Sequence, residues 1–76
     1  MMTKEQYITS KTYDPLQIVY HYYSEKGGTY GFQEVATALM MSGRMHQIVE
    51  RVMQEYDAKY ELTAILDKEG KFIKYI

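Results

Sequence analysis

Apolar residues recur at helical spacing in the first part of the 76-residue chain. A first helix is indicated by residues at i, i+3, i+4 and i+7, namely Leu16, Val19, Tyr20 and Tyr23. Asp14-Pro15 suits its start, because Asp caps helices well and Pro is tolerated at the first helical position. Lys26-Gly27-Gly28 suits its end. We therefore predict a helix between Asp14 and Lys26.

Two further helices follow the same pattern. The second, from about Phe32 to Met40, has apolar residues at i, i+3, i+4 and i+7, namely Phe32, Val35, Ala36 and Leu39. Met41-Ser42-Gly43 is expected to end it. The third has the most regular period in the chain, with Met45, Ile48, Val49, Val52, Met53 and Tyr56 on one face. Between the first two helices, Thr29-Tyr30 is predicted to be a short bridging strand.

The last residues, Tyr60–Ile76, read as a β-hairpin. Asp67-Lys-Glu-Gly70 is a turn sequence with Asp first and Gly last. A three-residue loop would pair Leu66 with Phe72 and Leu62 with Ile76, and we expect this set to pack on the helices. The opposite face would pair Ile65 with Ile73 and Thr63 with Tyr75. Because that face is also apolar, either residues 1–13 or a partner is expected to cover it.

Residues 1–13 leave two alternatives open. Thr3 and Gln6 could form a capping box that opens a short helix, whereas Tyr7-Ile8-Thr9 has strand character. We predict an N-terminal arm at 1–13, frayed or docked, and a domain at 14–76. The predicted fold class is α+β, with three helices followed by a C-terminal two-stranded hairpin.

Composition and charge narrow the function. The chain has nine basic and ten acidic residues, a net charge of −1, and no cysteine. The lack of cysteine excludes disulfides, cysteine-based zinc sites and thiol nucleophiles, and it suits a reducing compartment. Neither end resembles a targeting segment, and no apolar run approaches the ~20 residues that span a bilayer. We predict a cytoplasmic protein that does not bind membranes.

No catalytic signature is present. His21 and His46 lie on different predicted helices, with no acid at a metal-ligand or triad spacing. Gly27-Gly28 lacks the lysine and the spacing of a phosphate-binding loop. Tyr20, Tyr22 and Tyr23 could stack on single-stranded bases, but two of them lie on the core stripe. The sequence predicts a protein that is not an enzyme and that has no metal, cofactor or small-molecule substrate.

The order of elements resembles the winged helix-turn-helix superfamily over roughly residues 14–76. Phe32–Gly43 looks like the first helix and turn of the motif, with Ala36 as the small residue between helices. Residues 44–57 would be the recognition helix, and 67–71 the wing. Met40 stands where the motif usually has glycine, and Gly43 follows three residues later.

The resemblance implies a small regulator that binds double-stranded DNA, and a homodimer would double its contacts. In such proteins the recognition helix contacts base edges and the wing contacts phosphates. Carried over by position, the candidates are Arg44, His46, Gln47 and Arg51 on the helix, with Lys68 and Lys71 on the wing. Glu50 and Glu55 lie among them, and such mixed charge is also usual for a solvated helix face. The near-neutral chain lacks the basic surplus of most nucleic-acid binders.

The alternative is a protein-binding adaptor or inhibitor on the same scaffold, for example a viral protein encoded by a phage and acting on a host protein. Nine tyrosines and six methionines suit a protein-binding surface, although they also suit a core. The candidate partner or dimer surface is the second face of the hairpin, namely Ile65, Ile73 and Tyr75. Convergence of the candidate cations on one side would favour DNA, and their dispersal among acids would favour a protein target.

Overall fold

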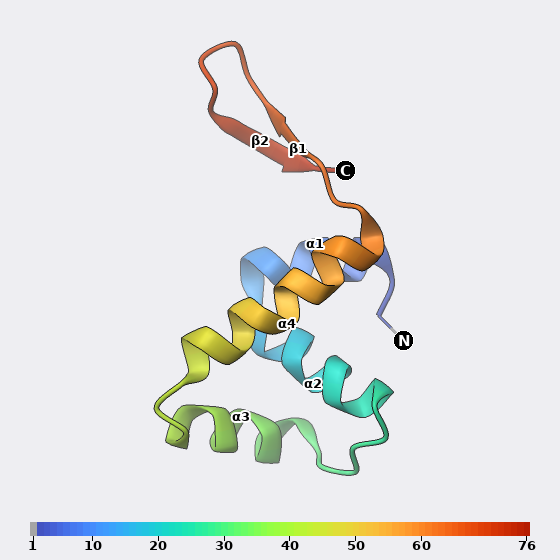
Figure 1. Cartoon of the computed structure of the whole chain (residues 1–76), viewed down its shortest axis with the longest axis vertical. Helices are drawn as coiled ribbons and strands as arrows, with labels where there is room; N and C mark the ends of the chain where they lie inside the picture. Colours follow the sequence, from blue (N-terminus) through green and yellow to red (C-terminus); the bar gives the residue numbers. More distant parts are fainter. Residues whose placement is uncertain (1) are drawn as a thin grey trace.

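The computed structural model describes residues 2–76, which form an α+β domain of four helices and a C-terminal two-stranded antiparallel hairpin (Figure 1). The helices are α1 (Lys4–Tyr13), α2 (Pro15–Glu25), α3 (Phe32–Met41) and α4 (Met45–Tyr60), and the strands are β1 (Ala64–Leu66) and β2 (Phe72–Tyr75). α2 packs against each of the other three helices. The predicted α+β class is confirmed, but the predicted number of helices is wrong, because a fourth helix precedes the other three.

The additional helix is α1, which comes from the segment predicted to be a frayed or docked arm. The Thr3 hydroxyl accepts a hydrogen bond from the Gln6 amide, and the Gln6 side chain accepts one from the Thr3 amide, so a capping box opens the helix. Tyr7 is fully buried, and α1 packs on α2 and α4. The segment is therefore docked. Periodicity did not reveal it, because Tyr7 is the only buried residue within α1 and makes no apolar stripe.

The other helices begin and end near the predicted residues. α2 starts at Pro15 and is followed by Gly27 at φ +89°, a left-handed conformation that favours glycine. α4 continues to Tyr60, one turn further than predicted. The bridging strand predicted at Thr29-Tyr30 is not formed, since the sheet within residues 2–76 contains only β1 and β2. None of these helices has both the length and the apolar character needed to cross a membrane.

All four helices contribute to one core. The buried side chains are Met2, Tyr7, Ile18, Val19, Val35, Ala36, Leu39, Val52 and Tyr56. The centroid of the Tyr7 ring lies 5.1 Å from that of Tyr56 and 5.8 Å from that of Tyr60. Aromatic pairs of this kind contribute about 0.5–1.5 kcal/mol beyond the burial of their area. Part of the tyrosine surplus therefore joins α1 to α4.

The hairpin turn forms as its sequence predicts. Gly70 adopts φ +82°, which glycine accommodates without strain. The Asp67 carboxylate accepts hydrogen bonds from the amides of Glu69 and Lys71, at 2.8 and 2.9 Å. These bonds close the turn and hold the Asp67 side chain in place.

The register of the hairpin differs from the prediction after its first pair. Leu66 pairs with Phe72, as predicted, but a β-bulge then inserts one extra residue, Ile73, into β2. The predicted pairs Ile65–Ile73, Thr63–Tyr75 and Leu62–Ile76 are replaced by Ile65–Lys74, Ala64–Tyr75 and Thr63–Ile76. A bulge of this kind has no clear signal in the pattern of apolar residues. Alternation alone therefore predicted a regular pairing with no inserted residue.

The hairpin also does not fold back on the helices. Of the four residues expected to pack there, only Leu62 contacts the core, while Leu66, Phe72 and Ile76 are about half-exposed. At the end of α4, Glu61 adopts a left-handed conformation with φ +51°. The chain then leaves the helical body, and both strands run beyond the C-terminal end of α4 (Figure 1).

Candidate functional site

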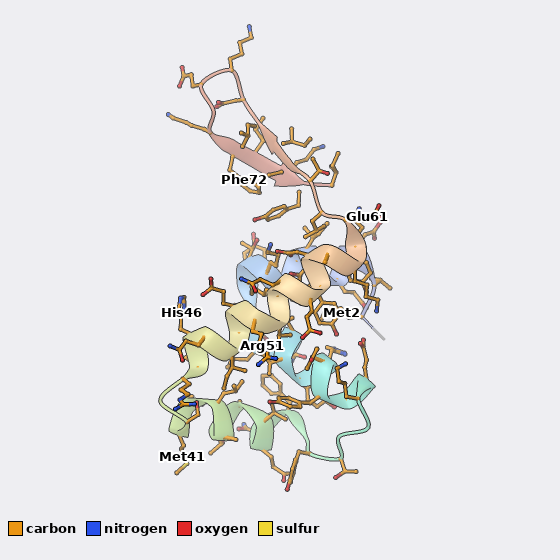
Figure 2. The ribbon with its side chains drawn as sticks, viewed as in Figure 1. Met2, Met41, His46, Arg51, Glu61 and Phe72 are labelled. Carbon is orange, nitrogen blue, oxygen red and sulfur yellow. The ribbon has the colours of Figure 1, made fainter. Side chains whose placement is uncertain are left out.

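Four large apolar side chains of the hairpin face solvent. Leu66, Phe72, Ile73 and Ile76 have exposed fractions of 54%, 54%, 56% and 51%, and we call them the hairpin apolar surface. Figure 2 shows Phe72 on the hairpin, well past Glu61 at the end of α4. The register places Leu66 and Phe72 on one face of the hairpin and Ile76, which pairs with Thr63, on the other. Single exposed apolar residues are ordinary on soluble proteins, but four on one projecting element indicate an interaction site.

Two residues hold the base of the hairpin to the helices. Leu62 packs against the core, and its amide donates a hydrogen bond to the Asp57 carbonyl at 3.2 Å. The Tyr75 ring is half-buried, and the Lys11 ammonium lies 4.2 Å from its centroid. A cation over an aromatic face contributes about 0.5–1 kcal/mol at such partly exposed sites. The base is therefore anchored, whereas the hairpin apolar surface is left open.

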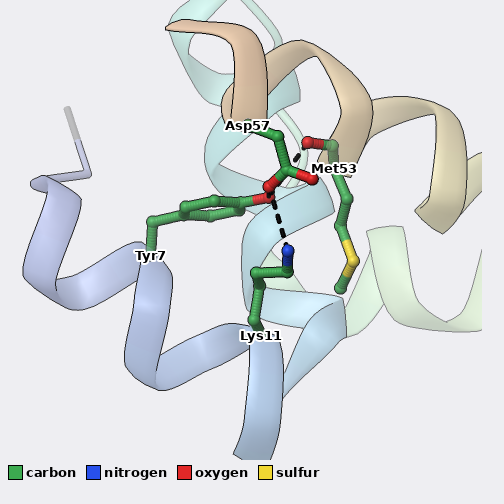
Figure 3. Close-up of polar contacts among 4 residues, drawn as sticks. All are labelled: Tyr7, Lys11, Met53 and Asp57. Carbon is green, nitrogen blue, oxygen red and sulfur yellow. Dashed lines mark hydrogen bonds and ion pairs between the residues drawn. The ribbon is translucent and has the colours of Figure 1, made fainter. Parts of the chain in front are cut away.

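Lys11, which contacts Tyr75, also belongs to a cluster of polar groups between α1 and α4 (Figure 3). The Lys11 ammonium lies 3.0 Å from the Asp57 carboxylate. The Tyr7 hydroxyl lies 2.5 Å from the same carboxylate oxygen and 2.9 Å from the Met53 carbonyl. Burial, and then the hydrogen bond to Asp57, raise the pKa of Tyr7 well above its ordinary value. This cluster links α1, α4 and β2, and every group in it already has a partner, so we assign it a structural role.

The candidate DNA contacts of the helix lie at the start of α4. Arg44 is the residue before the helix, and the exposed His46 and Gln47 occupy its first turn. The His46 Nε2 lies 3.7 Å from the Glu50 carboxylate, one turn further along. An acid therefore sits beside these groups, as the sequence indicated.

Arg51 lies further along α4 and also has an acidic neighbour. It is exposed, and Glu55 on the same helix accepts a hydrogen bond from the Tyr22 hydroxyl at 2.8 Å. That bond raises the pKa of Tyr22, while the nearby Arg51 charge acts to lower it. Glu55 follows Arg51 by four residues, so this acid lies one turn further along the same helix.

The candidate wing contacts, Lys68 and Lys71, lie at the far end of the hairpin. Both are exposed, and the Lys71 ammonium lies 3.7 Å from the Glu69 carboxylate. α4 has 16 residues and so extends for about 24 Å. Since the hairpin leaves its C-terminal end, the turn lysines and Arg44 lie toward opposite ends of the molecule (Figure 1). The structure does not bring the predicted DNA contacts together.

The three residues predicted for a partner surface have different environments. Ile65 is partly buried, Tyr75 is partly covered by Lys11, and Ile73 is exposed. Residues 1–13 therefore cover part of this set, because Lys11 of α1 reaches Tyr75 but Ile73 is left open. Sequence reasoning missed Leu66 and Phe72 as surface residues, since it placed them against the helices.

A second apolar region lies at the opposite end of the domain. Tyr23, Tyr30 and Leu39 help to line an open groove of about 880 Å³ between the end of α2 and α3. Met40, Met41 and Met45 are exposed where α3 turns into α4. In the sequence, only the surplus of tyrosine and methionine indicated such a region, and composition does not show which residues form it.

No group of three or more histidine or acidic side chains gathers as a possible metal site within residues 2–76. In comparisons with known proteins, no family model, no curated protein and no solved structure matches this chain.

Proposed function

We propose that this protein is a non-enzymatic protein-binding module, and that its hairpin contacts the partner. The observation that carries the proposal is the hairpin apolar surface, which projects from a helical body that already has its own core. Interface centres are enriched in aromatic and large apolar side chains and depleted of charge. Phe72 and Ile73 fit that description.

The energetics of the hairpin support this proposal. An isolated two-stranded hairpin is marginally stable in water, and more strands or a packing layer are usually needed. Here the two strands pair mainly with each other and contact the helices only near their base. Burying the face of Leu66 and Phe72 against a partner would supply the missing layer, at roughly 25 cal/mol per Å² of apolar area removed from water.

The charge distribution favours a protein over DNA as the target. Neutralised phosphates supply much of the affinity for nucleic acid, and they require cations gathered on one face. Here Arg44 and Lys71 lie toward opposite ends of the molecule, and His46 and Lys71 each have an acidic neighbour. DNA binding stays a prediction. So does the winged-helix resemblance, whose order of three helices and a hairpin is present in α2, α3, α4, β1 and β2.

The proposal is tested by replacing Ile73 with aspartate in a tagged protein and capturing partners from an extract of the native host. Ile73 is exposed, so Ile73→Asp is expected to leave the circular-dichroism melting curve nearly unchanged. Loss of a buried apolar contact at an interface centre typically costs 2 kcal/mol or more, so capture should fall by about thirtyfold.

The matched control is Gln47→Asp, which adds the same charge at an exposed position on α4. It is expected to capture the partner as well as the unaltered protein does. Capture that survives Ile73→Asp but is lost in Gln47→Asp would move the binding surface to α4. Salt-sensitive retention of DNA fragments, with no stoichiometric protein partner, would replace the proposal with the DNA-binding alternative.

A further inference from the structure

We propose that the outer edge of β1 binds an extended segment of the partner as a third strand, and that this segment carries a cation at each end. The inference rests on the proposed function and specifies how the hairpin is used. Adding a strand to an open sheet edge is a recurring mode of recognition, in which main-chain hydrogen bonds supply affinity.

The backbone of β1 has one side free. The amides of Thr63 and Asp67 donate to the carbonyls of Ile76 and Lys71, so these positions face β2. Peptide groups alternate in direction along a strand. The amides of Ala64 and Leu66 therefore point away from β2, and they donate to no other element within residues 2–76. They form the open edge.

β1 is a better edge for strand addition than β2. The bulge at Ile73 distorts β2, Lys74 places a charge within it, and Lys71 places another directly before it. Bulges and lysines are the devices that natural proteins use to block edge pairing. The segment Leu62–Leu66 has neither, and it contains no charge, proline or glycine. Only one of the two edges is therefore protected.

The charges at the ends of this edge indicate its occupant. Glu61 precedes the segment and Asp67 follows it, and the Asp67 carboxylate is held in place by the turn amides. A second copy pairing antiparallel would bring the Glu61 end of one chain to the Asp67 end of the other. Like charges facing each other across strands are destabilising, and opposite charges are stabilising. The edge therefore disfavours its own copy and favours a strand flanked by lysine or arginine.

The test is an NMR titration of the ¹⁵N-labelled full chain with a short synthetic peptide. The peptide has five alternating valines and threonines between two lysines, and the comparison peptide has glutamates in place of the lysines. The lysine peptide is expected to shift the amide signals of Ala64 and Leu66 most strongly. It should bind about tenfold more tightly than the glutamate peptide, because the Glu61 and Asp67 carboxylates at the two ends of the edge attract its lysines and repel the glutamates.

Ala64→Pro provides the matched variant. The Ala64 amide is not used within the hairpin, so proline at this position removes an outward donor while the pairing with β2 is retained. The Ala64→Pro variant should no longer bind the lysine peptide, whereas Ala64→Thr, which keeps the amide, should still bind it. Equal binding of both peptides, retained binding by Ala64→Pro, or no shift at millimolar peptide would overturn the proposal.

The outcome is separable from that of the proposed function. If Ile73→Asp abolishes capture of the natural partner but the lysine peptide leaves the β1 amides unchanged, the hairpin binds through its side-chain face and strand addition is wrong. If the peptide binds the edge while capture does not depend on Ile73, the edge is available but the partner binds elsewhere.

Discussion

Replacing Tyr7 with alanine is expected to lower the free energy of unfolding by about 3–5 kcal/mol, the usual cost of removing a buried aromatic ring. Tyr7 has no exposed surface, and its ring contacts those of Tyr56 and Tyr60. Because small domains have only about 5–15 kcal/mol of stability in total, this loss should leave a substantial unfolded fraction at 37 °C. Urea denaturation followed by circular dichroism measures it.

Two comparison variants separate the role of the ring from that of the hydroxyl. Tyr7→Phe keeps the ring but removes the bond to Asp57, and should cost only about 1–2 kcal/mol. Tyr13→Ala changes an exposed tyrosine of the same helix and should cost less than about 0.5 kcal/mol. If Tyr7→Ala were as mild as Tyr13→Ala, α1 would be a dispensable arm and not part of the core.

Raising the pH from about 10 to about 11 is expected to lower the free energy of unfolding steeply, because unfolded tyrosines titrate near pH 10. Burial raises the pKa of both Tyr7 and Tyr56 well above that value in the folded protein; the hydrogen bond to Asp57 adds to the effect for Tyr7, and the negative charge of Glu25 adds to it for Tyr56. The unfolded chain therefore loses protons first. The contribution of these two tyrosines to the free energy of unfolding is fully present below pH 10. Above pH 10 it falls by about 1.4 kcal/mol per pH unit for each tyrosine.

Tyr56→Phe is the control for this alkaline loss. The Tyr56 hydroxyl is buried and has no hydrogen-bond partner within residues 2–76, so its removal should not destabilise the protein at neutral pH. The variant should lose the contribution of Tyr56, so its slope above pH 10 should be smaller by about 1.4 kcal/mol per pH unit. Denaturant titrations at three pH values measure the slopes. Equal slopes in both proteins would show that Tyr56 does not remain protonated in the fold.

Local signals in the sequence predicted most of the helices and the turn. α2, α3 and α4 each have an apolar stripe, and Gly27 and Gly70 stand where left-handed backbone is required. α1 was left open because its burial depends on one residue, Tyr7, whose partners lie far away in the sequence on α4. The spacing of apolar residues shows which positions share one face of a helix, and it does not reveal a contact with a residue far away in the sequence.

The placement of the hairpin could not be predicted, because it depends on two local events that alternation does not encode. One is the left-handed conformation of Glu61, a residue type that rarely adopts it. The other is the bulge at Ile73, which changes the pairing of every residue beyond it. Ile73 was placed on the face away from the helices and is exposed, whereas Leu66 and Phe72 were assigned to the core.

The same events affect the two functional hypotheses differently. The wing contacts Lys68 and Lys71 needed a hairpin lying beside the start of α4, near Arg44, and the hairpin instead leaves the other end of that helix. The protein-binding hypothesis needed only exposed apolar groups, and the outward hairpin supplies more of them than the sequence predicted.

The central claim is that the hairpin projects from the helical body and is held only at its base. Nuclear Overhauser contacts between side chains in solution test it most directly. We expect contacts from the Tyr75 ring to Lys11 and from Leu62 to the helical core, and none from Phe72 or Ile73 to any helix. Contacts joining Phe72 or Leu66 to α4 would contradict the claim, because they would place the hairpin against the helices.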